Sequence, residues 1–402
     1  MSTAKNTPAA KTIRVAIVGI GNCASSLYQG LTYYNGYTKG KERDGLMKGD
    51  IGGYNVRNVD VVAAFDVDYR KVGKTLREAC FALPNCTPVY ERNVPDGPIV
   101  QMGPVLDGIA SVMERYPEDQ AFRASSEQPV DVVQVLLDRK VDILINYLPV
   151  GSQKATEFWA DACIQAGVSF LNCIPVFIAS NPEWEQKFID AGIPLVGDDM
   201  KSQFGASILS QMLQELAFER GHRVKCHIQR NVGGNTDFLN MTEQSRLKSK
   251  KISKENVIRS QNDIRGVAVG DSFLHAGPSE YIRYYGDNKV ANFRLEMEGF
   301  LGAPVILDAQ LSVIDSPNSA GVVIDAIRYL KVAREMGLVG ALRGPSAFTQ
   351  KTPPQQLTLN ETVAECDALA NRKLSRFTER QTKHYSAEEL YKIAPSHNTK
   401  VV

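Results

Sequence analysis

In the first half of the chain, short apolar runs rich in β-branched residues alternate with longer amphipathic stretches. Such runs are typical of buried parallel strands, and the stretches between them are typical of crossover helices. The predicted strands are Ile13–Val18, Val59–Val67, Val141–Tyr147, Val168–Asn172 and Pro194–Gly197. The predicted helices are Leu27–Gly36, Arg70–Ala82, Gly108–Tyr116, Pro129–Asp138, Gln153–Ala166 and Asn181–Ala191. This alternation predicts an α/β fold with a doubly wound parallel sheet.

The pattern changes from about Arg223 onward, where alternation of apolar and polar residues predicts a half-buried, mostly antiparallel sheet. Thr242–Asn262 is predicted to be a long polar helix, and Asn318–Met336 is predicted to be an apolar helix that returns to the first domain. The predicted strands are Val224–Arg230, Glu280–Tyr285, Lys289–Phe300 and Ala303–Val313, with a hairpin turn at Gly286–Asn288. We therefore predict a doubly wound domain (1–200), an inserted α+β domain for catalysis and oligomerisation (201–313), and a return to the first domain with a C-terminal tail (314–402).

The turn Gly19-Ile20-Gly21 directly follows the first predicted strand, and Asn22-Cys23-Ala24-Ser25 then opens a helix. Glycines at this place let backbone N–H groups approach a diphosphate, which the helix N-terminus attracts. Asp66 ends the second strand, where dinucleotide-binding folds hold the adenosine ribose, and its charge would repel a 2′-phosphate. Its separation from Gly21 exceeds the usual ~20 residues because the predicted loop Tyr37–Asn58 is inserted. The pattern predicts a Rossmann domain that binds NAD.

Polar residues follow several of the predicted parallel strands. Because such strands share one carboxyl edge, where these sheets bind ligands, the residues should gather around one site. They are Asp66, Asn146, Ser152, Asn172 and Asp199.

Composition excludes several other classes of function. The 402 residues carry 46 Lys and Arg against 45 Asp and Glu, a net charge of +1, so no global field would recruit nucleic acid or an anionic membrane. No apolar run is long enough to span a bilayer, and Met1–Lys11 is predicted to be a disordered leader without a signal-peptide core. Seven widely spaced cysteines favour a reduced, cytoplasmic protein. The five histidines include no ligand pair, so no metal site is predicted.

Four lysines crowd the segment around S-K-K-I-S-K, and Lys250 and Lys254 would project from one helix face. Crowded ammonium groups lower one another's pKa and can hold a phosphate, although most such clusters are solvated helix faces. The positions of Lys289 and Lys351 in the sequence do not by themselves indicate a role for either lysine. Asp198–Ser202 could cap a helix or bind phosphate.

Two further segments leave similar alternatives open. The loop Asn231–Asp237 could be a ligand loop or a plain turn, and Asn318 or Ser319 could simply cap the apolar helix while Asp315 stays free at a strand end.

Taken together, nine strings spread over about Ile13 to Ala370 resemble the myo-inositol-1-phosphate synthase family, in its shorter bacterial and archaeal branch. They are G-I-G-N-C-A-S-S, A-A-F-D-V-D, Y-L-P-V-G-S, P-V-F-I-A-S, V-G-D-D-M-K-S-Q, N-V-G-G-N-T-D-F-L-N-M, K-K-I-S-K, D-S-P-N-S-A-G-V and K-T-P-P. The stretch Ser202-Gln203-Phe204-Gly205 departs from the eukaryotic pattern D-D-x-K-S-G-Q-T, and the chain from about Asn371 has no assigned counterpart.

The resemblance implies an NAD-dependent isomerase that converts D-glucose 6-phosphate to 1D-myo-inositol 3-phosphate by C5 oxidation, enolisation, aldol closure and re-reduction. It implies Lys250 as the acid/base at the C5 hydroxyl, oriented by Asp199. Lys254, Lys289 and Lys351 would hold the phosphate and stabilise oxyanions, and Asp315 would lie by the nicotinamide. Ser202, Asn235 and Asp237 would line the substrate site, and the implied assembly is a homotetramer. The implied cofactor contacts are Gly19, Ile20, Gly21, Asn22, Cys23, Ala24, Asp66, Asn146, Ser152 and Asp198.

Two other functions fit parts of the pattern. An ordinary NAD-dependent dehydrogenase of a phosphorylated sugar or amino acid would release NADH, whereas an isomerase would not. A non-catalytic NAD-binding regulator would bind the cofactor without turnover.

Overall fold

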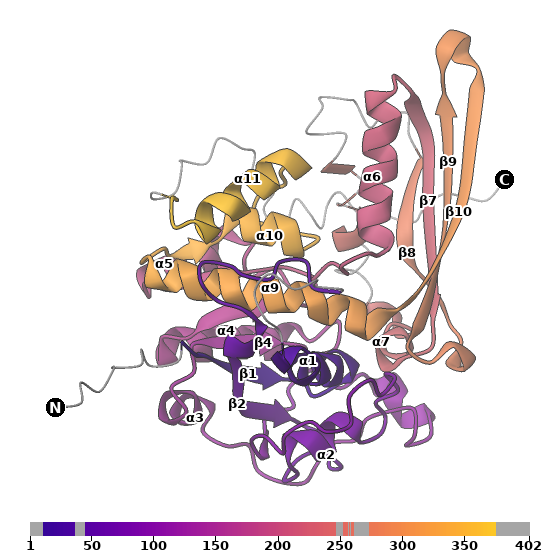
Figure 1. Cartoon of the computed structure of the whole chain (residues 1–402). Coiled ribbons are helices and arrows are strands. Elements are labelled where there is room, and N and C mark those ends of the chain that lie inside the picture. The colour runs from indigo at the N-terminus through magenta and orange to yellow at the C-terminus, as the bar shows by residue number, and fades with distance from the viewer. Residues whose placement is uncertain are drawn as a thin grey trace.

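The computed structural model describes residues 11–36, 45–246, 252–255, 257, 259–260 and 273–374. Within them, the larger of two sheets has seven parallel strands in the order β11-β6-β5-β4-β1-β2-β3 (Figure 1). The strands are β1 Ile13–Val18, β2 Val59–Asp66, β3 Val100–Met102, β4 Ile143–Asn146, β5 Ser169–Asn172, β6 Pro194–Val196 and β11 Gly340–Ala341. The predicted doubly wound α/β fold is confirmed.

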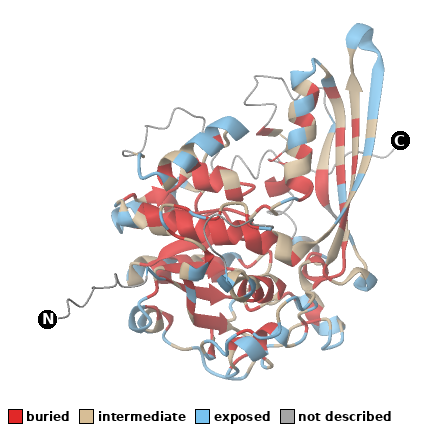
Figure 2. Cartoon of the chain, in the orientation of Figure 1, coloured by how far each residue is buried: buried red, intermediate tan, exposed pale blue. Residues whose placement is uncertain are grey.

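Each strand of this sheet sends alternate side chains to two separate cores, which is why the strands read as continuous apolar runs. On one face Ile13, Val15 and Ile17 pack with helices α1 (Asn22–Tyr33) and α9 (Asp315–Glu335). On the other face Ala16 and Val18 pack with α3 (Val132–Asp138) and α4 (Gln153–Ala166). Figure 2 shows the sheet and α9 as the most buried parts of the molecule. The helices are α1 Asn22–Tyr33, α2 Leu76–Phe81, α3 Val132–Asp138, α4 Gln153–Ala166, α5 Pro182–Asp190, α6 Ala206–Glu219, α7 Thr236–Asn240, α9 Asp315–Glu335, α10 Arg343–Thr349 and α11 Leu359–Ala370. Short 3-10 turns are η1 Tyr34–Gly36, η2 Val56–Asn58, η3 Ser111–Arg115, η4 Gln244–Arg246, η6 Arg283–Tyr285 and η7 Phe300–Gly302.

Two predicted helices are shorter than expected. The predicted helix Arg70–Ala82 begins only at Leu76, because Thr75 and Glu78 form a capping box there and the preceding residues form turns. The predicted helix Gly108–Tyr116 is only the 3-10 turn η3. The segment between them also contains β3, which apolar patterning missed because the strand has only three residues.

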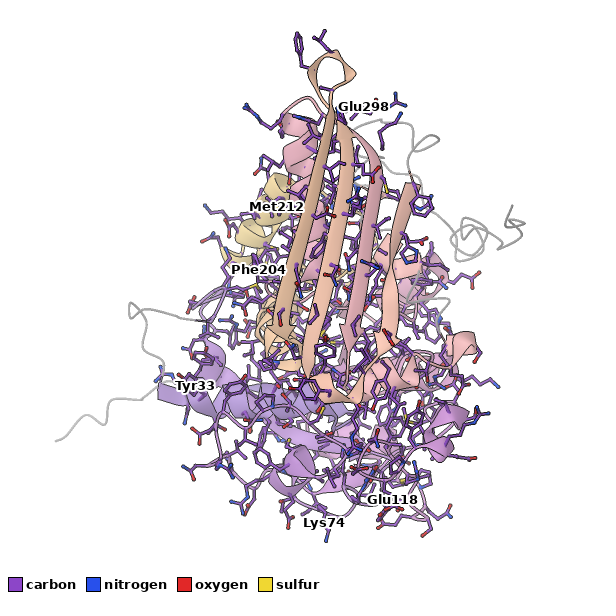
Figure 3. The ribbon with its side chains drawn as sticks, turned by 90° about the vertical axis from the view of Figure 1, so that its right-hand side faces the viewer. Tyr33, Lys74, Glu118, Phe204, Met212 and Glu298 are labelled. Atoms are coloured by element: carbon purple, nitrogen blue, oxygen red, sulfur yellow. The ribbon has the colours of Figure 1, made fainter. Side chains whose placement is uncertain are left out.

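The second sheet has the order β10-β9-β7-β8 and is seen face-on in Figure 3. Its strands are β7 Arg223–Gly233, β8 Phe273–Tyr281, β9 Asn288–Glu298 and β10 Pro304–Ile314. Alternation along β9 is as predicted, since Ala291, Phe293 and Leu295 are buried against α6 while Arg294 and Glu296 point to the other face.

The predicted hairpin at Gly286–Asn288 is wrong. Strand β8 pairs in parallel with β7, and the hairpin partner of β9 is β10. The chain does turn sharply at Gly286, but the buried carboxylate of Asp287 binds Ser316 and Asn235, which anchors this turn at the start of α9. The turn residues correctly predict a chain reversal, but they do not determine which strands pair.

Parts of two predictions fall outside the described residues. For the predicted helix Thr242–Asn262, the described parts are residues 242–246, which end in the 3-10 turn η4, and helical residues 252–255, 257 and 259–260. Most of the tail from Asn371 also lies outside. In the described ranges, no helix is both long and apolar enough to cross a lipid bilayer, and no cluster of metal-ligand side chains occurs.

Candidate active site

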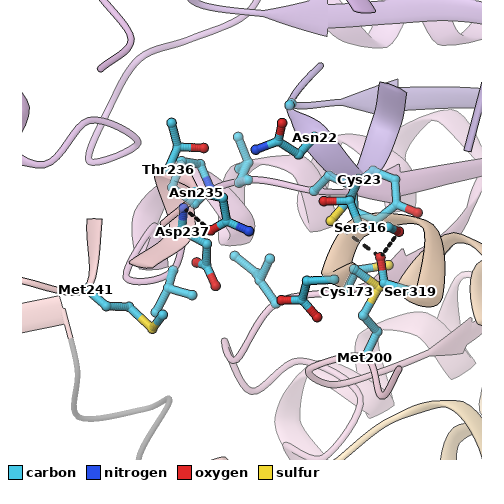
Figure 4. Close-up of a pocket in the computed structure, with 18 of the residues that line it drawn as sticks. Asn22, Cys23, Cys173, Met200, Asn235, Thr236, Asp237, Met241, Ser316 and Ser319 are labelled. Atoms are coloured by element: carbon cyan, nitrogen blue, oxygen red, sulfur yellow. Dashed lines mark hydrogen bonds between the residues drawn. The ribbon is translucent and has the colours of Figure 1, made fainter. Parts of the chain in front are cut away.

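One cleft joins the carboxyl edge of the parallel sheet to the second sheet (Figure 4). We call one group of its lining residues the glycine wall, which consists of Gly19, Gly21, Asn22, Cys23 and Asp66. A second group is the lysine wall, which consists of Asp199, Lys254, Lys289, Asp315 and Lys351.

The turn between β1 and α1 is open on the side of the cleft. Gly19 has φ +87°, and a Cβ there would lie 2.7 Å from the carbonyl oxygen of Tyr147, so only glycine fits. Gly21 is the N-cap of α1, and no atom lies within 4 Å of the place where its Cβ would stand. The first turn of α1, with unpaired N–H groups and the positive end of the helix dipole, therefore borders open space.

Asp66 closes this cradle from the end of β2. Its Oδ2 accepts a 2.6 Å hydrogen bond from the N–H of Ile20, and its Oδ1 accepts from the N–H groups of Val67 and Asp68. The carboxylate is thus fixed at the tip of the strand and borders the cleft. An open diphosphate cradle with a fixed acid at the strand end fits NAD.

The other predicted cofactor residues of the first turn differ in whether their side chains face the cleft. Ile20 and Ala24 are fully buried, with side chains in the core rather than in the cleft. The Asn22 Oδ1 accepts hydrogen bonds from the N–H groups of Cys86 and Thr87, so this side chain holds a neighbouring loop. Burial raises the pKa of the Cys23 thiol to about 12, so Cys23 lines the cleft as a neutral group.

Three predicted cofactor contacts, Asn146, Ser152 and Asp198, do not line the cleft. Asn146 donates to Asn172 over 2.9 Å, and Asn172 donates to Asp198 over 2.7 Å. These hydrogen bonds form a buried chain across the ends of β4, β5 and β6. Asp198 also accepts from the loop at Ile178–Ser180, and burial raises its pKa to about 6. Ser152 donates to the carbonyl of Pro149. These side chains are engaged in holding the strand ends and loops.

Asp199 and Lys351 meet because the segment 349–352 runs beside 198–201. The N–H of Lys351 donates to the carbonyl of Asp199, and the N–H of Lys201 donates to the carbonyl of Thr349. This pairing places the Lys351 Nζ 2.9 Å from Asp199 Oδ1 and 2.6 Å from the carbonyl oxygen of Met200. Both side chains are largely buried, where such an ion pair is strongly oriented.

A second ion pair joins Lys289, at the start of β9, to Asp315, the first residue of α9. Both side chains border the cleft. Behind them, Asp287 accepts from the hydroxyl of Ser316, and burial together with the neighbouring Asp315 charge raises the Asp287 pKa.

The predicted substrate residues also border the cleft. Asn235 is the N-cap of α7, with its Oδ1 accepting from the N–H groups of Asp237 and Phe238, and Asn235 and Asp237 both line the cleft. Ser202 lies beside the N-terminus of α6, where Ala206 and Ser207 also face the cleft.

Known proteins resemble the chain over most of its length. A family model described as myo-inositol-1-phosphate synthase matches residues 205–316. The chain is 48% identical over 358 residues to an inositol-3-phosphate synthase of Mycolicibacterium smegmatis, covering 88% of this chain and 97% of the relative. It is 47% identical over 350 residues to the enzyme of that name from Corynebacterium glutamicum, covering 86% and 94%. The chain belongs to the myo-inositol-1-phosphate synthase family.

Membership in this family confirms the predicted family and the prediction of an enzyme that is an isomerase. The fold agrees as well. A myo-inositol-1-phosphate synthase-related protein of Thermotoga maritima superimposes with a TM-score of 0.73 at 24% identity, over 90% of this chain and 98% of that one.

Lys250, to which the family resemblance assigns the acid/base role, lies outside the described residues. Lys254 is described, is 9% exposed and borders the cleft, so it is not on a solvated helix face. Lys254, Lys289 and Lys351 line the same cleft but come from three separate segments. Their spacing in the sequence therefore could not predict that they lie in one wall.

Sequence reasoning missed the residues behind the lysine wall. Ser253 donates to Asp199 Oδ2 over 2.7 Å, and Thr352 donates to Ser253 over 2.9 Å, so two buried hydroxyls hold the carboxylate that faces Lys351. The only available signal was adjacency, since Ser253 precedes Lys254 and Thr352 follows Lys351.

Lys201 was also missed. Burial, with repulsion from Lys351, lowers the Lys201 pKa to about 7, and its Nζ donates to the carbonyl of Ala347. Lys201 thus lies next to the lysine wall with a lowered pKa, whereas the predicted lowering among the lysines around S-K-K-I-S-K stays a prediction.

Proposed function

We propose that the chain converts D-glucose 6-phosphate to 1D-myo-inositol 3-phosphate with bound NAD, using both walls of the cleft. The observation that carries the proposal is that a dinucleotide-type glycine turn and three lysines border the same cleft. An isomerase of this kind needs a redox cofactor next to cations that stabilise oxyanions, and separate sites could not provide this.

The glycine wall is the proposed NAD site. The open space beside Gly21 and the uncapped start of α1 would receive the diphosphate, and Asp66 would accept from the ribose hydroxyls. Bound NAD supplies a hydride acceptor that becomes the hydride donor at the end of the reaction. Because substrate and product are isomers, the cofactor leaves the cycle unchanged.

The start of α6 is the proposed site of the substrate phosphate. Gly205 caps this 14-residue helix without a side-chain hydrogen bond, and Ser202, Ala206 and Ser207 line the cleft there. A phosphate dianion would be held by free N–H groups, hydroxyls and the helix dipole. The Gln203 side chain donates to the carbonyl of Gly45 instead, so it takes no part.

The lysine wall is the proposed place of enolisation and ring closure. Lys351, oriented by Asp199, and Lys289, oriented by Asp315, present ammonium groups that would stabilise the oxyanions formed when a proton leaves C6 and when C6 attacks the C1 aldehyde. Lys254 adds a third charge. Lys250 keeps its predicted role as the acid/base at the C5 hydroxyl, with Asn235 and Asp237 as substrate contacts.

The proposal is tested by incubating the purified protein with glucose 6-phosphate and NAD while following NADH absorbance and inositol phosphate together. We expect the cyclised product without accumulation of NADH. Accumulating NADH without cyclised product would indicate the dehydrogenase, and NAD binding with no turnover would indicate the regulator.

We further propose a homotetramer assembled through the second sheet. Support comes from its outer face, on which Phe273 and Ile306 are 62% and 55% exposed, and from Phe300 and Leu301 in the turn between β9 and β10, which are 87% and 90% exposed. Adjacent, strongly exposed apolar side chains such as Phe300 and Leu301 are the part of this surface that a protein–protein contact would bury. Sedimentation equilibrium should give four times the mass of the chain, and a monomer would contradict the proposal.

A further inference from the structure

A lysine outside every predicted site lies buried beside the glycine turn. Lys71 follows β2 in the turn before α2 and is only 3% exposed. Its Nζ donates to the carbonyl of Ile20, in the glycine turn itself, over 2.6 Å and to Asn85 Oδ1 over 2.9 Å. Both acceptors are neutral, and a buried charge is costly unless it is paired.

The nearby carboxylates do not supply the missing partner. Asp66 accepts from three backbone N–H groups, and Asp68 pairs with Arg70 and accepts from the N–H of Arg123. Within the described part of the chain, Lys71 makes no ion pair with any acidic side chain. Its ammonium group is therefore held by neutral acceptors, without a carboxylate at ion-pair distance among these residues.

The same lysine borders the cleft, together with Gly21, Asn22 and Asn85. Two of its three N–H groups are used by Ile20 and Asn85, which leaves one for a ligand. The loop that carries Asn85 is tied to the start of α1, because Asn22 accepts from the next two N–H groups of that loop. Lys71 is thus held next to the open cradle at Gly21, and an anion there would meet both the helix dipole and this ammonium.

We propose that Lys71 binds the diphosphate of the dinucleotide cofactor and supplies the counter-charge that the glycine turn lacks. The inference rests on the proposed NAD-dependent function and adds to it a cofactor residue outside the glycine motif. It also explains why the protein keeps a buried ammonium with only neutral acceptors. The cost of burying the charge is recovered when the anion binds.

The decisive variant is Lys71→Met, which keeps the volume and removes the charge. Lys74→Met is the matched control, since Lys74 lies in the same turn and is exposed. By titration calorimetry, we expect Lys71→Met to weaken NAD binding by roughly 10- to 100-fold, or about 1.4–2.8 kcal/mol, through the loss of a charge-assisted hydrogen bond. Binding of adenosine, which has no phosphate, should stay the same, and Lys74→Met should bind NAD as the parent does.

Melting temperature without cofactor separates this role from a structural one. The carbonyl of Ile20 keeps a second donor, Asn85 Nδ2 at 3.1 Å, so Lys71→Met should melt at or above the parent temperature when no cofactor is present. Its stabilisation by NAD should shrink. A lower melting temperature with unchanged NAD affinity would make Lys71 a structural residue and overturn the inference.

Two further outcomes are distinguishable. If the parent protein binds no NAD, the proposed function fails at its cofactor. If the parent binds NADP more tightly than NAD and Lys71→Met loses that preference, the ammonium serves a 2′-phosphate and the diphosphate assignment is wrong.

Discussion

The two walls of the cleft are built on different principles. The glycine wall is one short, contiguous segment plus one acid, and the polar groups it offers to the cleft are mainly backbone N–H groups left open by Gly21. The lysine wall is assembled from segments around residues 199, 254, 289, 315 and 351, and the polar groups it offers are charged side chains, two pairs of which join distant segments. The first depends on local conformation, whereas the second depends on where the chain brings distant charges.

This difference predicts that substitutions in the two walls have separate effects. Changes to the glycine wall should alter NAD binding or folding, and changes to the lysine wall should alter turnover with NAD binding intact. The following variants test this separation.

The largest effect is expected from Lys351→Met. Removing an oriented cation that stabilises an oxyanion should lower kcat by a factor of roughly 10² to 10³, while the NAD dissociation constant stays unchanged. Product assays and calorimetry measure the two quantities. Lys187→Met, at a half-exposed surface lysine, serves as control.

Because Lys351→Met leaves Asp199 buried without this partner, the double variant with Asp199→Asn should restore stability and stay inactive. Normal turnover in a folded Lys351→Met protein would remove Lys351 from the mechanism.

Gly21→Val and Gly19→Ala should separate ligand binding from folding within the glycine wall. A side chain at Gly21 enters open space, so the protein should melt normally but bind NAD about tenfold more weakly or worse. A Cβ at Gly19 meets the Tyr147 carbonyl at positive φ and should lower the free energy of unfolding by about 1–3 kcal/mol. Full NAD affinity in Gly21→Val would show that the diphosphate does not lie there.

A smaller effect is expected from Thr352→Val, which is isosteric and removes the donor to Ser253. Looser positioning of Asp199 should lower kcat by about fivefold, which corresponds to one hydrogen bond of roughly 1 kcal/mol. KM for NAD should not change. Thr352→Ser keeps the hydroxyl and should restore kcat, and an equal loss in both variants would point to packing instead.

The last prediction concerns Lys201 and the pH dependence of stability rather than turnover or NAD binding. Its folded pKa of about 7 lies below the unfolded value near 10.4. Between these pH values the unfolded chain binds one more proton, so the free energy of unfolding should rise as pH increases from 7 to about 10. Denaturant titrations should show a flatter profile for Lys201→Met, whereas Lys225→Met at an exposed ion pair should keep the parent slope. Identical profiles would mean that this lysine is not neutralised by burial.

The wrongly predicted hairpin at Gly286–Asn288 shows that local sequence does not determine which strands pair. Turn residues at Gly286–Asn288 indicated a reversal correctly, but β8 pairs with β7 because strand partners are chosen by contacts far apart in sequence. Asp198 shows the same limit within the site. Asp198 and Asp199 are neighbours in sequence, but one holds a loop and the other faces the lysines.

The sequence by itself determined the doubly wound sheet, the glycine turn after β1 and the acid at the end of β2. Each depends on a local rule: side-chain period, backbone freedom at glycine, and the common edge of parallel strands. Only the tertiary structure decided that Lys254, Lys289 and Lys351 share one wall, that Ser253 and Thr352 support it, and that Lys71 is buried beside the glycine turn. Charges interact through space, and their distances are set by the packing of the whole fold rather than by their spacing along the chain.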